Sequence, residues 1–270
     1  MRIGVLNTWL SQRYQPFWLE FLRALGQELV PPDGSEVAVE LPIGRSGRQV
    51  VAEVIALRGQ VDYLLVPDIQ LGQESQRVMG CWWGDDLKSA LEETVSGLPP
   101  LLSVKGELGP WTLGEAVETG QTLVRNPSLL QRALDQTRHL ILPVPARERS
   151  EGQIGLAAEP YLLEDPGFYP ELSAYSQQRG WGLRLASGSP EELRQEGRRL
   201  GLGPLLPSDL EFAGMAAKLS REGGVEGIIL LSDDFCPAGE NLAQKIATHL
   251  SRPNFCLTVS SELSVLAGWP

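Results

Sequence analysis

The chain has 270 residues, of which 42% are hydrophobic and 21% are charged. These proportions are typical of a globular protein and exclude a disordered or fibrous one, and the length suffices for one large domain or two ordinary ones. The net charge is −11 and the isoelectric point is near 4.8. This charge argues against a nucleic-acid or anionic-membrane partner, because phosphate groups require a basic surface.

The N-terminal segment and the cysteine content both indicate where the protein works. The opening MRIGVLNTWL is too short and too polar for a signal peptide, and no run of about 18 apolar residues occurs. The three cysteines, Cys81, Cys236 and Cys256, are too few for a secreted disulfide scaffold. The sequence therefore predicts a cytoplasmic protein with reduced thiols and no membrane partner.

Short apolar runs alternate with helical patterns in the first part of the chain. We expect strands at residues 2–7, 37–41 and 61–66, and helices at 15–29 and 49–57. Alternating strands and helices predict right-handed crossovers and a mostly parallel sheet. The next residues, from about 70 to 148, are richer in Gly, Pro and polar residues. They are expected to form a helical and loop insertion, with helices at 86–96 and 128–136.

The alternation starts again after the charged stretch ARERSEGQ, which we interpret as a linker. Strands are expected at 153–158, 182–186, 225–231 and 255–259, with helices at 169–179, 209–221 and 239–250. Ser189 and Glu192 predict a helix start with a capping box. The strand at 225–231 is the most apolar, so we expect it at the sheet centre.

The two halves therefore predict the same architecture twice. The fold class is α/β, with two Rossmann-like domains, mostly parallel sheets and a cleft between the domains. We place the N-terminal domain at 1–148 and the C-terminal domain at 149–270.

The segment that follows the strand at 225–231 carries the strongest candidate chemistry. Ser232, Asp233 and Asp234 end this strand, and Cys236 faces the first turn of the next helix. Ligands of open α/β sheets collect at such strand ends, where a helix N-terminus stabilises a thiolate. Asp233 and Asp234 could bind a hard cation or cap the helix. Equally, Cys236 could be a half-buried residue of the turn.

For the other candidate groups the structural explanations are the more common ones. Cys81 lies in MGCWWGDD, where the tryptophans could shield a cluster or simply fill a gap between domains. Cys256 is expected to pack inside the last strand. Gly44-Arg45-Ser46-Gly47 precedes a helix and could cradle an anion, but it lacks the lysine of a phosphate-binding loop and is more often a turn.

The order of several motifs resembles the acyl-CoA dehydratase activase-related proteins and the subunits of 2-hydroxyacyl-CoA dehydratases. The opening strand is followed by a Pro-Phe-Trp helix core, residues 16–18, and then by Leu41-Pro42-Ile43 and the strand 61–67. Glu159-Pro160-Tyr161 is similar to the family's Gly-Arg-Pro-Tyr motif, and the segment from 225 through Cys236-Pro237 is similar to its last cysteine motif.

This resemblance implies an iron–sulfur protein. Subunits of these dehydratases hold a four-iron, four-sulfur cluster, which receives an electron from an ATP-driven activator and passes it to a 2-hydroxyacyl-CoA. Cys81 and Cys236 match two of the family's cysteines, and Glu40 stands where a third is expected. Pro160 and Tyr161 become cleft candidates, although Glu159 replaces the arginine that would suit an acyl-CoA phosphate.

Three interpretations are left open. The first is an iron–sulfur electron-transfer protein of this dehydratase group, with Cys81 and Cys236 as ligands. Glu40, an exogenous ligand, a second subunit or a homodimer would complete its site, and an ATP-dependent activator would be a partner. The second is a clusterless relative that binds a small molecule or partner protein between its domains. The third is an unrelated two-domain α/β binding protein.

Overall fold

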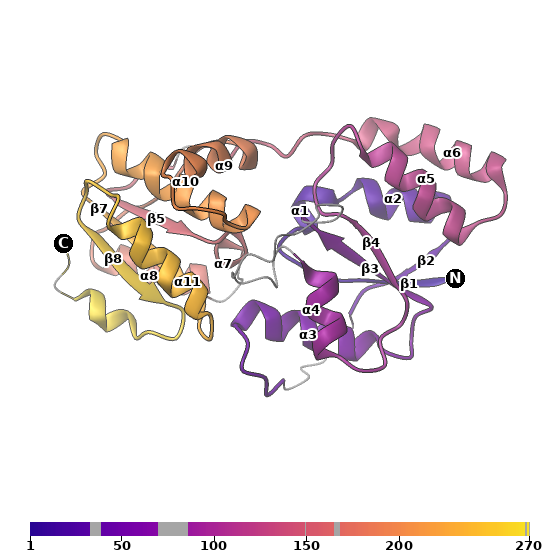
Figure 1. The fold of residues 1–270 in the computed structure, drawn as a ribbon, viewed down its shortest axis with the longest axis horizontal. Coiled ribbons are helices and arrows are strands. Elements are labelled where there is room, and N and C mark those ends of the chain that lie inside the picture. The colour runs from indigo at the N-terminus through magenta and orange to yellow at the C-terminus, as the bar shows by residue number, and fades with distance from the viewer. Residues whose placement is uncertain (33–38, 70–85, 149, 165–167, 268, 270) are drawn as a thin grey trace. The chain divides into compact units, whose positions relative to one another are not determined.

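The computed structural model describes the chain except residues 33–38, 70–85, 149, 165–167, 268 and 270 (Figure 1). The described residues form two compact units. The first comprises those of 1–41 and 47–144, and the second is built on 145–270 and also takes in 42–46. Each unit is an α/β fold on its own four-stranded parallel sheet.

The first sheet has the strand order β2-β1-β3-β4. Its strands are β1 (Arg2–Val5), β2 (Glu28–Val30), β3 (Tyr63–Asp68) and β4 (Leu101–Lys105). The central strands β1 and β3 pair with Ile3 opposite Tyr63 and Val5 opposite Leu65. Almost every residue of β3 is buried, as expected of a parallel strand covered on both faces.

Helices cover both faces of the first sheet. In chain order they are α1 (Ser11–Tyr14), α2 (Phe17–Ala24), α3 (Arg45–Leu57), α4 (Leu87–Thr94), α5 (Thr112–Leu123), α6 (Pro127–Thr137) and a 3₁₀ turn, Arg138–Leu140. Figure 1 shows α2, α5 and α6 on one side and α3 and α4 on the other. The connection from β1 to β2 and the connection from β2 to β3 run in opposite directions across the sheet. Because both crossovers are right-handed, their helices lie on opposite faces of the sheet.

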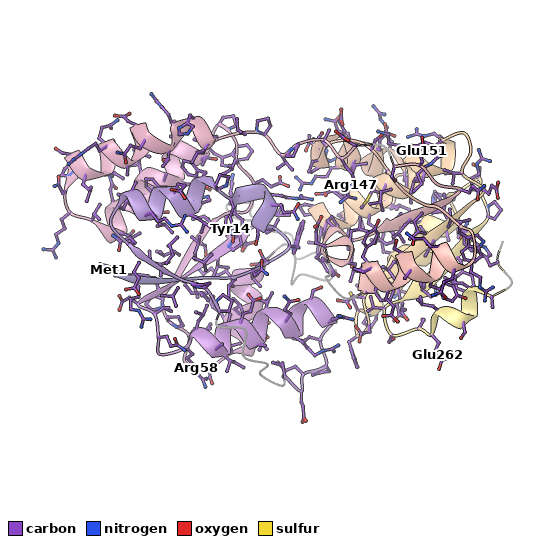
Figure 2. The ribbon with its side chains drawn as sticks, turned by 180° about the vertical axis from the view of Figure 1, so that it is seen from behind. Met1, Tyr14, Arg58, Arg147, Glu151 and Glu262 are labelled. Atoms are coloured by element: carbon purple, nitrogen blue, oxygen red, sulfur yellow. The ribbon has the colours of Figure 1, made fainter. Side chains whose placement is uncertain are left out.

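Aromatic residues of α2 form the centre of the first core. Phe17, Trp18 and Phe21 are fully buried, and their ring centroids lie 5.3–5.9 Å apart. Tyr14 is also buried, and its hydroxyl donates to the Leu6 carbonyl at 3.2 Å (Figure 2). Such aromatic side chains contribute a large share of the buried apolar area.

The second sheet repeats the order of the first, as β6-β5-β7-β8. Its strands are β5 (Ile154–Ala158), β6 (Leu183–Leu185), β7 (Gly227–Ser232) and β8 (Asn254–Thr258). All residues of β5 and β7 are buried, which confirms the prediction that the apolar run 225–231 lies at the sheet centre. The shared strand order confirms two α/β units with parallel sheets.

The helices of the second unit are likewise distributed over both sheet faces. They are α7 (Pro160–Leu163), α8 (Phe168–Gln178), α9 (Pro190–Arg199), α10 (Pro207–Arg221), α11 (Pro237–Ala247) and a 3₁₀ turn, Leu263–Leu266. Helices α10 and α11 pack on each other and on the central strands, and α8 lies on the opposite face (Figures 1 and 2). The capping box of Ser189 and Glu192 at the start of α9 is confirmed.

Helices α9 and α10 approach so closely that their contact requires glycine. A Cβ atom on Gly214 would lie 1.8 Å from the Leu193 carbonyl oxygen, and one on Gly197 would lie 2.1 Å from that of Leu210. Beside this contact, the buried Arg194 guanidinium pairs with Glu211 at 2.6 Å. Helix α9 is strongly polar, so it is held by this close approach and ion pair as well as by apolar packing.

Several elements differ from those predicted by the sequence. The helix expected to reach residue 29 ends at Ala24, because Gly26 adopts φ +75° and reverses the chain into β2. The described residues 39–41 of the strand expected at 37–41 are not in a strand. Strand β4 and helix α5 were not predicted, although β4 is the fourth strand of the first sheet. Cys256 was expected in the core but is exposed, because β8 is an edge strand.

None of the helices in the described part of the chain is long and apolar enough to cross a membrane.

Candidate functional site at the carboxyl edge of the second sheet

The strand order of the second sheet marks one place on its carboxyl edge. The chain leaves β5 toward β6 on one side and leaves β7 toward β8 on the other. Adjacent connections that diverge in this way open a crevice at the strand ends, and ligands of open α/β sheets bind there. The residues after β5 and after β7 are therefore the first candidates for function.

Glu159 follows β5 directly and is 0% exposed. Its Oε2 accepts a hydrogen bond from the hydroxyl of Tyr161, two residues further on. No hydrogen-bond donor reaches its Oε1. Burial, and next the negative charge of Asp209, raise the pKa of Glu159 well above its usual value, which favours the neutral, protonated form of this carboxyl group.

Asp209, in the first turn of α10, is the closest electrostatic partner of Glu159. Its Oδ2 accepts from the backbone N–H of Leu206 at 3.3 Å. Burial raises the pKa of Asp209 to about 6, while hydrogen bonds from Glu159 and from Leu206 oppose the rise. The contact between the two carboxyl groups raises the pKa of Glu159 and opposes the rise in that of Asp209, so a proton held by this buried pair resides preferentially on Glu159.

Tyr161 supports this pair from the first turn of α7. Burial, and next the charge of Glu159, raise the pKa of the Tyr161 phenol well above its ordinary value. The hydroxyl therefore stays protonated and acts as a hydrogen-bond donor. Pro160, the first residue of α7, is buried beside it and fixes the backbone geometry of this helix start.

Asp233 contributes a third buried carboxyl group directly after β7. Its Oδ1 accepts from the backbone N–H of Asp234 at 2.9 Å and from that of Arg45 at 3.3 Å. Burial, and next the neighbouring Asp234, raise the pKa of Asp233 to about 7. The charge of Asp233 also adds to the rise in the pKa of Glu159, which places the two strand ends in one electrostatic environment.

Cys236 is the N-cap residue of α11 and is 6% exposed. Its Sγ accepts from the backbone N–H of Gly239 at 3.3 Å. The residue is disulfide-bonded, so the prediction of reduced thiols is wrong for Cys236. The preceding Phe235 has φ +56° and is 61% exposed. A left-handed backbone at a bulky residue is uncommon and concentrates at functional sites.

The structure brings together most of the residues that the sequence singled out. Ser232 is the last residue of β7, and Asp233, Asp234 and Cys236 follow it at the same edge where Pro160 and Tyr161 follow β5. The Ser232 hydroxyl donates to the Leu257 carbonyl at 3.5 Å, so this side chain is hydrogen-bonded to the neighbouring strand β8. Glu40 is an exposed residue of the first unit. Cys81 lies outside the described residues.

Sequence reasoning missed the two central carboxyl groups, Glu159 and Asp209. Glu159 was interpreted only as the loss of an arginine, although its position after a continuously apolar strand could have marked it. Asp209 carried no such signal, because the capping position of a helix is a common place for an aspartate.

The described residues do not form a metal centre by themselves. Nowhere in this part of the chain do three His, Cys, Asp or Glu side chains gather in a way that could hold a metal ion. The buried carboxyl groups are instead arranged for sharing protons.

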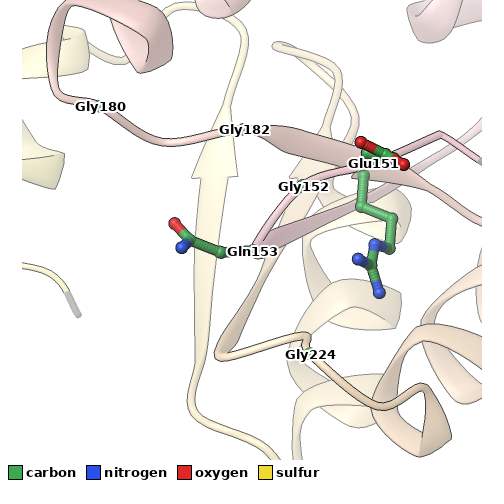
Figure 3. Close-up of a pocket in the computed structure, with 7 residues that line it drawn as sticks. Glu151, Gly152, Gln153, Gly180, Gly182 and Gly224 are labelled. Atoms are coloured by element: carbon green, nitrogen blue, oxygen red, sulfur yellow. The ribbon is translucent and has the colours of Figure 1, made fainter.

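A pocket of about 710 Å³ lies at the other edge of the second sheet (Figure 3). It is lined by Glu151, Gly152, Gln153, Gly180, Gly182, Arg184 and Gly224. Figure 3 shows a rim made largely of glycine backbone. The Arg184 guanidinium donates to the Gly223 carbonyl at 2.9 Å and lies 3.7 Å from Glu222. Its charge is thus matched within the chain, and the carboxyl edge is the stronger candidate.

No protein-family model, curated protein or solved structure matches this chain. The similarity to the 2-hydroxyacyl-CoA dehydratase group therefore rests on the motifs of the sequence alone.

Proposed function

We propose that the second unit binds a small molecule at the carboxyl edge of its sheet and that Glu159 exchanges a proton with it. One observation carries this proposal: Glu159 is completely buried, yet its Oε1 has no hydrogen-bond donor. A buried polar atom without a partner costs about 1–3 kcal/mol. Such a cost is understandable where a ligand supplies the missing donor.

The charges at this edge indicate the chemistry of the ligand. Asp209 and Asp233 have pKa values of about 6 and about 7, so both are largely or partly ionised at neutral pH. Carboxylates accept hydrogen bonds and attract positive charge. A ligand with hydroxyl or protonated amine groups therefore suits the edge better than an anion does.

Glu159 and Asp209 together also have the properties of an acid–base pair. The pKa of Glu159 is raised well above its usual value and that of Asp209 is raised to about 6, and two carboxyl groups that hold protons unequally divide the acid and base roles in catalytic pairs. The structure of the pair thus favours proton transfer to or from a bound hydroxyl or amine.

Ethanolamine, which carries both donor groups, is a suitable probe. We expect millimolar ethanolamine to shift the amide NMR signals of residues 159–161 and 232–239 in the full chain, and acetate to leave them unchanged. Glu159→Gln should weaken the effect at least about tenfold, the cost of one hydrogen bond to a charged or acidic group. Glu151→Gln, at the opposite sheet edge, is the matched control. Shifts caused by acetate alone, or ethanolamine shifts unaffected by Glu159→Gln, would contradict the proposal.

A second candidate function, iron–sulfur electron transfer, is favoured by the hydrogen bond from Gly239 to Cys236 Sγ. N–H donors to sulfur tune cluster ligands, and the N-terminus of α11 stabilises a thiolate. A four-iron cluster takes four thiolates, so Cys236, the one cysteine described at this edge, is not enough even after its disulfide is reduced. A second subunit or a second copy of the chain would supply the others, and an ATP-dependent activator would supply the electron.

Anaerobic iron and sulfide analysis of the reduced protein tests this second candidate. We expect a brown protein with absorbance near about 400 nm, typical of such clusters, which is lost in Cys236→Ser and kept in Cys256→Ser. A colourless wild-type protein with all thiols titratable would exclude it.

A further inference from the structure

The pocket at the other edge of the second sheet contains a buried arginine. Its volume of about 710 Å³ lies within the usual range of small-molecule sites. Arg184, the middle residue of the edge strand β6, lines this pocket and is only 9% exposed. A buried guanidinium needs hydrogen-bond acceptors, because its five N–H donors lose their contact with water on burial.

Only one side of the Arg184 guanidinium is used within the protein. Its Nη1 donates to the Gly223 carbonyl at 2.9 Å and lies 3.7 Å from Oε2 of Glu222. Among the residues that the structure describes, no acceptor reaches the buried Nε, and the bond from Nη1 is the one hydrogen bond of this group. The N–H bonds of Nε and Nη2 point in parallel on the side away from Nη1, and such a pair matches the two oxygens of a carboxylate.

Glycines form the wall of the pocket next to the guanidinium. A Cβ atom on Gly224, which adopts φ +82°, would lie 3.7 Å from both Nη1 and Nη2 of Arg184. Gly152 and Gly182 meet where the chain enters β5 and β6 (Figure 3), and a Cβ on Gly152 would lie only 2.3 Å from the Gly182 carbonyl oxygen. Because these three positions carry no side chain, none of them fills the space beside Arg184.

The charges around the pocket favour a ligand without net charge. Glu222 already balances the charge of Arg184, so a ligand with only a carboxylate would add an unbalanced negative charge. Glu151 is an exposed residue that lines the same pocket, and its carboxylate attracts a positive group. A zwitterion supplies a carboxylate for the Arg184 N–H groups and a positive charge of its own.

From this geometry we propose that the pocket binds a free amino acid, whose carboxylate is held by Nε and Nη2 of Arg184. The carboxylate accepts two parallel hydrogen bonds and gives the buried Nε the partner that it lacks. The ammonium group balances the carboxylate and is attracted by Glu151. The volume of the pocket leaves room for the side chain of the amino acid beside the glycine wall.

Three small probes test this proposal in the full-length protein. L-alanine carries both charged groups, L-alaninamide lacks the carboxylate, and propionate lacks the ammonium group. We expect millimolar L-alanine to shift the amide NMR signals of residues 151–153, 180–184 and 224. L-alaninamide should bind at least about tenfold more weakly, because it loses hydrogen bonds between charged groups. Propionate should bind about two- to fivefold more weakly, the effect of one exposed charge interaction.

A variant of Arg184 separates the paired N–H groups of arginine from its charge. Lysine keeps a positive charge beside Glu222 but offers no parallel N–H pair, so Arg184→Lys should bind L-alanine at least about tenfold more weakly. Arg198→Lys, the same change in an exposed ion pair of α9, is the matched control and should bind like wild type. Circular dichroism establishes that both variants are folded. If Arg184→Lys does not fold, the comparison of L-alanine with L-alaninamide decides the outcome.

Three results would overturn this proposal. The first is a wild-type protein in which L-alanine shifts none of these signals. The second is an L-alaninamide or a propionate that binds as tightly as L-alanine, and the third is a folded Arg184→Lys protein that binds L-alanine like wild type. The proposal is independent of ligand binding at the carboxyl edge, because ethanolamine is expected to shift a different set of signals, those of residues 159–161 and 232–239.

Discussion

The carboxyl groups of Glu159 and Asp209 are hydrogen-bonded to each other inside the second unit, and this contact raises the pKa of Glu159 and opposes the rise in that of Asp209. Glu159 follows the central strand β5, and Asp209 lies in the first turn of α10. Neither residue meets the other without the packing of α10 on β5. The contact between Glu159 and Asp209 therefore depends on the folding of the whole second unit, and it also sets the proton affinity at the carboxyl edge of the sheet.

The raised pKa values predict that the protein loses stability as the pH rises. Burial holds the pKa of Asp209 at about 6 and that of Asp233 at about 7, above their values of about 4 in the unfolded chain. The folded state thus binds more protons between about pH 4 and 7, and its stabilisation is lost as the pH rises through this window. Urea unfolding at pH 5 and pH 8 should show a lower midpoint at pH 8.

Asp233→Asn should flatten this pH dependence, because the asparagine does not titrate. Glu151→Gln should not alter the pH dependence of the urea midpoint, because Glu151 lies in the pocket at the other edge of the sheet. Equal midpoints for wild type at both pH values would contradict the raised pKa values.

The hydroxyl of Tyr161 should contribute measurably to stability. Tyr161→Phe removes the donor to Glu159 Oε2 and leaves a completely buried carboxyl group with one partner fewer. We expect the free energy of unfolding to fall by about 1–3 kcal/mol. Because the lost hydrogen bond lowers the pKa of Glu159, this pKa should also rise in the variant, as measured by NMR titration.

Tyr175→Phe is the matched control for this experiment. The Tyr175 hydroxyl is buried without a hydrogen-bond partner, so its removal should be neutral or slightly stabilising. Equal losses in the two variants would show that the contact with Glu159 does not stabilise the fold.

The contact between α9 and α10 should not tolerate a side chain at its two glycines. Gly197→Ala and Gly214→Ala would each place a methyl 2.1 Å or less from a backbone carbonyl oxygen of the other helix, so the helices must move apart. Overpacking of this kind costs about 1–3 kcal/mol, which thermal unfolding measures. Gly114→Ala in α5 is the control, since its Cβ meets nothing within 4 Å, and it should stabilise by up to about 1 kcal/mol.

The ion pair of Arg194 and Glu211 should behave as a unit. Both side chains are buried beside the glycine contact, so Arg194→Met leaves a buried carboxylate without its main counter-charge. Breaking such a pair costs about 3–5 kcal/mol. The double variant with Glu211→Leu should recover most of this loss in urea unfolding, and a double variant no more stable than the single one would contradict this account.

The alternation of apolar runs and helical patterns was enough to predict two α/β units with parallel sheets. Hydrophobic periodicity is local, and the apolar run that became β7 and the capping box at Ser189 are confirmed for that reason. The strand at Glu28–Val30 was missed because it is only three residues long and follows the preceding helix after a turn of only three residues. Strand β4 was missed because glycines and prolines surround it.

The sequence by itself also determined one half of the candidate site, the acidic and cysteine segment after β7, since residues that follow a buried strand must lie at its carboxyl edge. Only the tertiary structure decided the other half. Glu159 and Asp209 are surface-type residues whose protonation depends on burial, and burial depends on helices and strands from distant parts of the chain. The electrostatics of the edge is for this reason a property of the packed unit and not of any segment within it.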